Sequence, residues 1–298
     1  MGRLLEDQLD PDLVLKRDLA YTTFEGDAKP LKARKSRGHL ATHIFIPDTQ
    51  VKPGVDIRHL DWIGSYIADS IGDRENVKMV VAGDWWDMPS LSSYDVGTAR
   101  MEGRRVAEDI AAGNYAFARF DGLIPKKRSW EYHFLFGNHE ERVQRAVNAN
   151  AQLDGLLSLA LLDTKQWQRH DFLDVVEIDG VWYSHFFANP MTGRPYGGQN
   201  VETRLKTIGH SFTMGHQQTY MYGLRFVGSQ SQHGLVAGAC YLHDEDYKGP
   251  QGNAHWRGII VKNEVADGSY SIVEVTLDFL CRRYEGIRLS EYLEKTAA

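Results

Sequence analysis

The feature that most limits how this chain can fold is a set of short apolar runs, each ended by side chains that can bind metal ions. The clearest run spans residues 134–140, Phe-Leu-Phe-Gly-Asn-His-Glu. Its apolar residues predict a strand, Gly137 allows a sharp turn, and the apolar spacing that follows predicts an amphipathic helix. An amide, an imidazole and a carboxylate therefore sit where a strand meets a helix, the edge at which α/β proteins bind ligands.

Taken alone, this turn also fits an ordinary helix N-terminus, with Asn138 as the cap and Glu140 stabilised by the helix dipole. Four other apolar runs, however, end in the same way. They are followed by Asp48 and Gln50, by Asp84 and Asp87, by His185, and by His216 and Gln218. Five such interruptions are hard to explain as five separate caps.

The first half of the chain has the order of a doubly wound α/β protein. Residues 43–46 predict a strand, residues 60–71 a helix and residues 77–82 a second strand, a βαβ unit whose crossover should be right-handed. This unit would bring Asp48 and Asp84 to one edge of a sheet. A helical segment over residues 100–120 and the strand before Asn138 continue the pattern.

The second half predicts antiparallel strands. Residues 172–186 alternate on both sides of an Asp-Gly turn, which is typical of a hairpin. Further strands are expected at residues 211–214, 235–239, 258–265 and 269–276. Residues 187–207 are expected to form a long loop. Parallel strands with helices, followed by antiparallel strands, predict two sheets stacked between helical layers.

The 298 residues are 42% hydrophobic and 25% charged, which suits a globular chain with a large core. We assign residues 1–38 to a polar N-terminal arm, residues 39–285 to the main domain and residues 286–298 to a C-terminal tail. The arm ends in a cluster of basic residues. It is either a solvated segment or a contact to an anionic partner.

Composition narrows the classes of function. No apolar run approaches the roughly 20 residues that span a bilayer, and the first residues lack a signal-peptide core. The only cysteines, Cys240 and Cys281, exclude a disulfide scaffold and favour a reducing cytosol. We therefore expect a cytoplasmic protein without a membrane partner. A net charge of −6 argues against broad binding of duplex nucleic acid, although bound cations can reverse the local field at a phosphate site.

Asp, Asn and His side chains presented from several strand ends are the ligands of a two-metal hydrolase. Oxygen and imidazole ligands suit Mn, Fe, Zn, Ni or Mg. Two divalent ions roughly 3.5–4 Å apart can hold a phosphoryl oxygen, lower the pKa of a bridging water and neutralise the charge of an in-line attack.

The full series resembles the calcineurin-like metallophosphoesterases. Their pattern is D-x-H, G-D-x-x-D, G-N-H-[DE], H and G-H-x-H. This chain has, in the same order, Asp48-x-Gln50, Gly83-Asp84-x-x-Asp87, Gly137-Asn138-His139-Glu140, His185 and Gly215-His216-x-Gln218. The resemblance covers residues 40–280. It implies an α/β fold, a four-layer αββα sandwich of two mixed sheets flanked by helices.

The resemblance also implies a function. Family members hydrolyse phosphoesters with a metal-activated water. The general look of this chain is similar to phage-encoded (bacteriophage) members, which implies a nucleotide or nucleic-acid substrate. Phosphodiesterase, phosphatase and nuclease activities all stay open, as do the exo or endo mode and the oligomeric state. A protein phosphatase is the weaker alternative, because Met88-Pro89 follows Asp87 where that group has Arg-Gly.

Metal ligands carry over by position. Asp84 would bridge two divalent ions. The second ion would also be coordinated by Asn138, His185 and His216. The first ion would also be coordinated by Asp48, Gln50 and Gln218. The family's two first-ion histidines are glutamines here. Because an amide oxygen is a weaker and harder donor than imidazole, we expect a loose first site that favours Mn or Mg over Zn.

Catalytic roles carry over in the same way. His139 would donate a proton to the leaving oxygen, and an acidic neighbour such as Glu140 or Asp48 would orient its ring. Asp87 would hold its loop or a ligand. Arg194 and Arg204 are candidates for substrate phosphate contact, because guanidinium groups match phosphate oxygens.

Three interpretations stay open at this stage. Of Trp85 and Trp86, one is expected in the core while the other could stack on a nucleobase. Residues 241–257 are either a solvated acidic loop or a lid over the substrate. The two glutamines also allow a degenerate family member that binds a phosphorylated ligand or partner without turnover.

Overall fold

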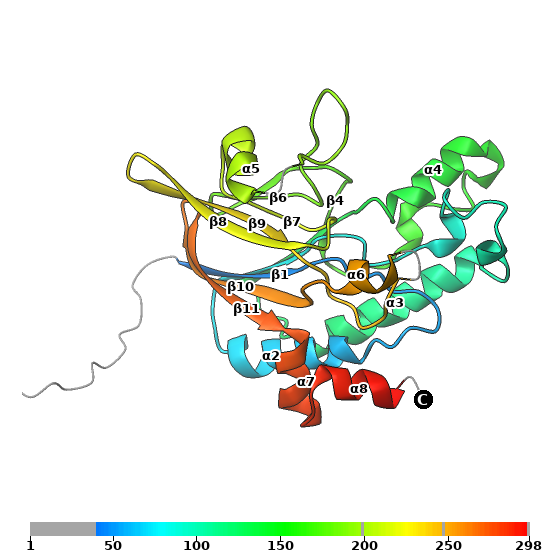
Figure 1. Ribbon diagram of the computed structural model, residues 1–298, viewed down its shortest axis with the longest axis horizontal. Coiled ribbons are helices and arrows are strands. Elements are labelled where there is room, and N and C mark those ends of the chain that lie inside the picture. Colours follow the sequence, from blue (N-terminus) through cyan, green and yellow to red (C-terminus); the bar gives the residue numbers. More distant parts are fainter. Residues whose placement is uncertain (1–39, 198–199, 246–247, 297–298) are drawn as a thin grey trace, which may run out of the picture. The chain divides into compact units, whose positions relative to one another are not determined.

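The computed structural model describes residues 40–197, 200–245 and 248–296. The predicted arm over residues 1–38 lies outside this part of the chain. The described residues form a mixed α/β structure in which two mixed sheets lie among helices (Figure 1).

The larger sheet has six strands in the order β11-β10-β1-β2-β3-β4. Its four parallel strands are β1 (Ala41–Ile46), β2 (Val77–Val81), β3 (Trp130–Leu135) and β4 (Gln168–His170). The antiparallel strands are β10 (Gly258–Ala266) and β11 (Ser269–Thr276). The predicted βαβ unit is therefore confirmed, and its parallel pairing fixes which strand ends meet.

The smaller sheet has five strands in the order β5-β6-β7-β9-β8. They are β5 (Val176–Ile178), β6 (Val181–Tyr183), β7 (Phe212–Met214), β8 (Tyr220–Val227) and β9 (Gln230–Ala237). Antiparallel pairs form as expected at β5–β6, β8–β9 and β10–β11, whereas β6, β7 and β9 run parallel and make this sheet mixed. The β5–β6 hairpin turns at Asp179 and Gly180, as predicted, with left-handed φ values of 49° and 80°.

Seven α-helices lie in the described residues. They are α2 (Arg58–Ile71), α3 (Val106–Leu123), α4 (Glu141–Ala149), α5 (Val201–Ile208), α6 (Gly249–Asn253), α7 (Leu277–Glu285) and α8 (Leu289–Thr296). The helices expected over residues 60–71 and after Asn138 are confirmed. The helix expected from residue 100 begins at Val106, because a short 3-10 turn at residues 99–101 precedes it.

Two segments differ from their predicted form. The end of the loop expected over residues 187–207 is α5, which Asn200 caps by accepting a hydrogen bond from the Glu202 amide. Gly209, with a φ of 80°, ends this helix. Residues 286–298, assigned to a tail, contain α8, where the Tyr292 ring meets Trp62 edge-on with a centroid distance of 5.1 Å.

Three apolar clusters define the layers. One fills the space between the six-stranded sheet and α2, α3 and α7, and includes Ile44 and Phe117. A second lies between the two sheets and includes Phe45. Alternation along β1 explains why Ile44 and Phe45 belong to opposite faces. A third cluster, with Leu205 and Phe212, packs α5 on the far face of the smaller sheet. This order of helices, sheet, sheet and helix is compatible with the predicted αββα sandwich (Figure 1).

Within the described residues, every helix is too short or too polar to cross a bilayer.

Candidate metal centre

The polar residues singled out in the sequence follow strands whose carboxyl ends meet. In the larger sheet, Ile46 pairs with Val81, and Val81 pairs with Phe134, so the turns after β1, β2 and β3 lie together. In the smaller sheet, β6 and β7 run parallel and end at the same edge. The segment after β9 joins the two edges, because Ala239 pairs with Asp48.

A cluster of side chains that could hold a metal ion forms where these edges meet. Asp84, His185 and His216 each offer a ligand atom, and these atoms all lie within 4.8 Å of one another. The His185 Nε2 lies 3.4 Å from the Asp84 Oδ2 and 3.0 Å from the Asn138 Oδ1. A carboxylate, an amide and two imidazoles therefore converge, a donor set that suits a divalent transition metal. All four belong to the ligands predicted for the second ion.

The tautomer of His185 supports a cation at this point. Its Nδ1 lies 2.7 Å from the Ala82 carbonyl oxygen, to which it donates, so the Nε2 lone pair faces the oxygens of Asn138 and Asp84. A second ring proton or a bound cation would satisfy these acceptors. Burial opposes the second proton, but the Asp84 carboxylate raises the pKa of His185 to about 9. The site therefore attracts positive charge.

The other ligands are in the protonation states that a metal requires. Burial alone would raise the pKa of Asp84, but the His139 and His185 imidazoles hold that pKa well below its usual range. Burial, together with the charge of His185, lowers the pKa of His216 to about 4. Asp84 is thus ionised and His216 neutral near pH 7.

The residues predicted for the first ion lie beside this cluster. Burial, followed by the charge of Asp84, raises the pKa of Asp48 to about 6. The Asp48 Oδ1 accepts a hydrogen bond from the His216 amide at 2.8 Å, and the Gln218 Nε2 lies 3.4 Å from the Asp48 Oδ2. Within the described part of the chain, the buried Gln50 Oε1 has no hydrogen-bond partner.

The backbone of the site is strained. Gln50, Asp84, His216 and Gln218 have left-handed φ values of 46°, 49°, 64° and 57°, which are uncommon for residues other than glycine. Such strain persists only where the surrounding structure enforces it, and it concentrates at functional sites.

Two of the motif glycines are required by close approach to the carboxylates. A Cβ on Gly137 would lie 2.1 Å from the Asp84 Oδ1, and a Cβ on Gly215 would lie 2.4 Å from the Asp48 Oδ1. Any side chain at either position would therefore displace an acidic residue of the site.

Glu140 has a different role from the one predicted. Its buried carboxylate accepts hydrogen bonds from the backbone N–H groups of Asp84, Trp85, Trp86 and Gly137, at 2.7 to 3.1 Å. It therefore holds the turn that carries Asp84 rather than the ring of His139. Burial, followed by the charge of Asp84, raises the pKa of Glu140 to about 7.

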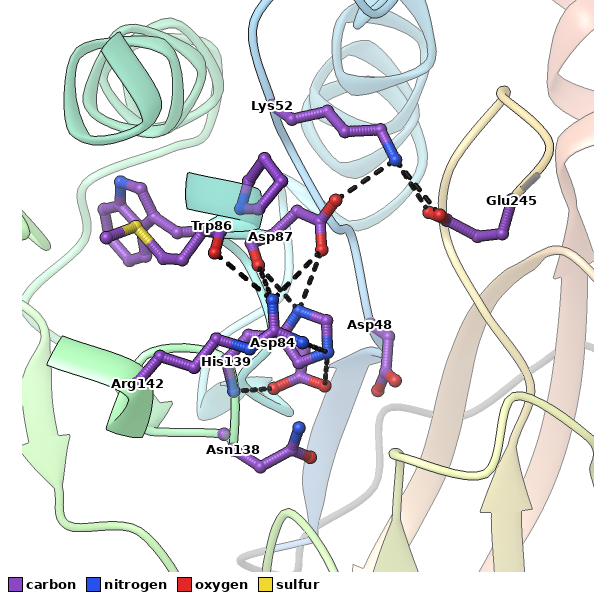
Figure 2. Close-up of polar contacts among 12 residues, drawn as sticks. Asp48, Lys52, Asp84, Trp86, Asp87, Asn138, His139, Arg142 and Glu245 are labelled. Atoms are coloured by element: carbon purple, nitrogen blue, oxygen red, sulfur yellow. Dashed lines mark hydrogen bonds and ion pairs between the residues drawn. The ribbon is translucent and has the colours of Figure 1, made fainter. Parts of the chain in front are cut away.

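Asp87 is the acidic residue that contacts His139. The His139 Nδ1 lies 2.8 Å from the Asp87 carbonyl oxygen and 2.9 Å from its Oδ1 (Figure 2). The opposite nitrogen, Nε2, lies 3.7 Å from the Asp84 Oδ2 and 3.1 Å from the Arg142 Nη2. Although burial lowers the pKa of His139, the Asp84 carboxylate and Asp87 together raise it above its usual value. The ring thus faces the metal cluster with one nitrogen and Asp87 with the other.

A cavity of about 890 Å³ opens beside Asn138, His139 and His216. Lys52 lies at its wall between two carboxylates, 3.1 Å from the Asp87 Oδ2 and 3.1 Å from the Glu245 Oε1 (Figure 2). The lining also includes the arginines Arg100, Arg104, Arg105 and Arg142. Six acidic residues of the described part of the chain, among them Asp87, Asp95 and Glu245, line the same cavity, so the wall beside the cluster carries both signs of charge.

Sequence reasoning missed several of these residues. They are Lys52, Arg142, Tyr241, Glu245 and Lys248, whose contacts place them at the site. Only Lys52 and Arg142 had a signal that could have found them, because they lie two and three residues beyond Gln50 and His139. The others, Tyr241, Glu245 and Lys248, come from the segment expected to be either a solvated acidic loop or a lid over the substrate. Their contacts with the site show that these three residues are not part of a simple solvated loop.

Other predicted contacts lie elsewhere. Arg204 is buried and donates a hydrogen bond to the Gln217 Oε1 at 2.6 Å, while Arg194 is exposed on the loop before α5. Neither belongs to the cavity lining defined by the described residues. Trp85 and Trp86 are both fully buried against Phe117, so the prediction that one could stack on a nucleobase was wrong.

Two comparisons with known proteins identify no family and no relative for this chain. A scan against protein-family models finds no match for the chain. A search of curated proteins likewise finds no matching relative.

Proposed function

We propose that this protein is a metal-dependent phosphoesterase of the calcineurin-like type. One observation carries the proposal. The Asp84 carboxylate, the Asn138 amide and the His185 and His216 imidazoles converge at one edge of stacked sheets, with a fifth polar group, His139, beside them. The strand order and the layers are compatible with the fold of that family.

Different residues of the site would have different roles in phosphoester hydrolysis. A divalent ion bound by the cluster would polarise a phosphoryl oxygen and lower the pKa of a coordinated water. Asp87 orients His139 by accepting from its Nδ1, and the His139 Nε2 accepts from the Arg142 guanidinium. Once protonated, this Nε2 would deliver a proton to the leaving oxygen. Arg142 and Lys52 supply positive charge at the cavity wall.

The cavity supports a proposal for the class of substrate. Its arginines offer guanidinium groups that match phosphate oxygens, whereas Lys52 is already paired with Asp87 and Glu245. Its volume of about 890 Å³ is large enough for a nucleotide. We therefore propose a phosphodiester or phosphomonoester of a nucleotide or nucleic acid as substrate. Tyr94, exposed at the cavity and 89% accessible, offers a face on which a base can stack.

Hydrolysis of bis(p-nitrophenyl) phosphate and p-nitrophenyl phosphate tests the proposal. With Mn²⁺ we expect turnover that EDTA abolishes and that His185→Ala lowers by more than about 100-fold, because a ligand is lost. His210→Ala is the matched control. This exposed imidazole stacks on Trp182 at the amino end of β7, the end opposite His216.

A second candidate function is binding of a phosphorylated ligand without hydrolysis. The two glutamines on the first-ion side favour a binding protein without turnover. Tight Mn²⁺ binding with no hydrolysis of either ester, under any divalent ion, would establish that alternative and contradict the phosphoesterase. Full activity in His185→Ala would contradict the assigned site.

A further inference from the structure

The amide of Gln218 is held in one orientation by its neighbours. The Tyr241 hydroxyl donates to the Gln218 Oε1 at 2.9 Å, and the Lys248 ammonium donates to the same oxygen. A lysine side chain has donors and no acceptor, so the Lys248 contact identifies the oxygen end of the amide. The carbonyl oxygen of Gln218 therefore faces Lys248 and Tyr241.

The opposite end of the amide faces the acidic residue of the first-ion side. The Gln218 Nε2 lies 3.4 Å from the Asp48 Oδ2, and the Asp48 Oδ1 accepts from the His216 backbone N–H at 2.8 Å. An amide nitrogen has no lone pair for a metal. Gln218 is therefore a hydrogen-bond donor toward Asp48 and not a metal ligand, and both Asp48 oxygens already face N–H groups.

Too few donors then remain for an ion on this side. Asp48 is hydrogen-bonded at both oxygens, Gln50 offers one neutral oxygen, and Asp84 is shared with the second-ion side. Hard divalent ions take about six oxygen ligands, with carboxylates among them. The opposite side, by contrast, offers four converging side chains.

A side-chain cation lies on the first-ion side. Asp48 is fully buried, and a buried carboxylate requires compensation. The Lys248 ammonium and Asp48 contact opposite ends of the Gln218 amide, and Lys248 also contacts the Tyr241 hydroxyl at 3.3 Å. A side-chain cation and its amide relay thus lie beside Asp48, the residue that the sequence resemblance assigned to the first ion.

We infer that this centre binds a single divalent ion, and that Lys248, acting through Gln218, takes the place of the first ion as the positive charge beside Asp48. The inference rests on the proposed function for the position of the remaining ion. Lys248 is a positioning residue here, because it acts on Asp48 through the Gln218 amide.

Metal content after equilibrium dialysis of the full chain against Mn²⁺ tests the inference, with elemental analysis as the readout. We expect one Mn²⁺ per chain, and an uncoupled six-line spectrum by electron paramagnetic resonance. Two ions per chain, or a spin-coupled pair, would overturn the inference while leaving the phosphoesterase intact. No bound ion would overturn the proposed function itself.

Variants examine the role of Lys248 separately. The triple change Gln50→His, Gln218→His and Lys248→Met should bind two Mn²⁺ per chain, because it restores two imidazoles and removes the competing cation. The double change with Lys248 retained should bind one, and Lys206→Met, an exposed lysine of α5, serves as the matched control. Two ions in the double change would show that Lys248 does not exclude the first ion. Melting temperatures establish that each variant is folded, and the wild-type count decides the main point without any substitution.

Discussion

The second-ion side and the first-ion side of the site both present carboxylate and neutral side chains, but they arrange them differently. On the second-ion side, Asp84, His185 and His216 direct their ligand atoms toward one point, and His185 is oriented by a backbone carbonyl behind it. On the first-ion side, Asp48 and Gln218 face each other and are hydrogen-bonded by their neighbours. The difference teaches that ligand capacity depends on where the surrounding donors lie, as well as on residue type.

The largest effect is expected from Asp84→Asn, which removes the only carboxylate of the metal cluster found among the described residues. The asparagine oxygen can still accept the His139 amide N–H that now lies 2.9 Å from the Asp84 Oδ1, so the fold should persist. We expect Mn²⁺ affinity and esterase turnover to fall by more than about 100-fold. Calorimetric titration and initial rates measure both, with the exposed Asp154→Asn as control. An unchanged Mn²⁺ affinity in Asp84→Asn would contradict the claim that the second-ion side, and not the first-ion side, binds the metal.

A smaller effect is expected from Asp48→Asn, the same change on the first-ion side. The substitution removes the charge that Lys248 attracts but leaves every second-ion ligand in place. Mn²⁺ affinity should change by less than about tenfold, and turnover should fall by about 10- to 100-fold, as for an outer-shell residue. The same titration and rate measurements apply. If Asp48→Asn lost Mn²⁺ as completely as Asp84→Asn, the two sides would be equivalent and the comparison would fail.

Glu140→Gln should act through stability. The carboxylate accepts four backbone N–H bonds from two turns, and a glutamine would place its NH₂ against some of those donors. We expect a loss of about 3 kcal/mol in the free energy of unfolding, because buried N–H groups lose their acceptor. Urea unfolding of this variant and of Glu141→Gln, its half-buried neighbour, measures the difference. Equal stabilities would show that Glu140 does not hold the Asp84 turn.

The smallest effect concerns pH, through a histidine away from the metal. His43 lies between the sheets, where its Nε2 contacts Asp179 at 2.8 Å and its Nδ1 contacts the Tyr183 hydroxyl at 2.7 Å. Burial lowers the pKa of His43 from 6.5 to about 4, despite the opposing hydrogen bond to Asp179. Between pH 6.5 and pH 4 the His43 side chain is protonated in the unfolded chain but not in the folded protein. Its contribution to the free energy of unfolding is therefore complete above pH 6.5 and is lost as the pH falls toward 4.

For His43 this loss amounts to about 2 kcal/mol between pH 7 and pH 5. The difference between the wild type and His43→Gln in urea unfolding at the two pH values isolates that contribution. We expect the wild type to lose more stability than the variant, whereas parallel losses would mean that His43 does not titrate with folding. The contrast with His185, whose pKa is raised beside Asp84, would sharpen the distinction between a structural and a ligand histidine.

Much of the site was predictable because it depends on strand order. Parallel strands of one sheet bring their carboxyl ends together, so the residues after β1, β2 and β3 had to be neighbours. Asp84, His185 and His216 converge as that reasoning predicts, and the helices with clear apolar periodicity were found.

The rest depends on side-chain orientation, which spacing does not encode. Glu140 turns toward backbone amides, and both Trp85 and Trp86 turn inward, although each lies next to a polar motif residue. Lys248 comes 30 residues after Gln218 and reaches it only because the segment after β9 returns to the site. α5 was missed because its apolar residues follow a Gly/Pro-rich loop that dominates the local composition.

Anomalous diffraction from a crystal soaked in Mn²⁺ tests the central claim most directly, because it locates the ion without reference to activity. We predict one peak, about 2–2.5 Å from ligand atoms of Asp84, Asn138, His185 and His216, and none between Asp48 and Gln218. Absence of a peak at those four side chains, with Mn²⁺ bound elsewhere on the protein, would contradict the assignment of this cluster as the metal centre.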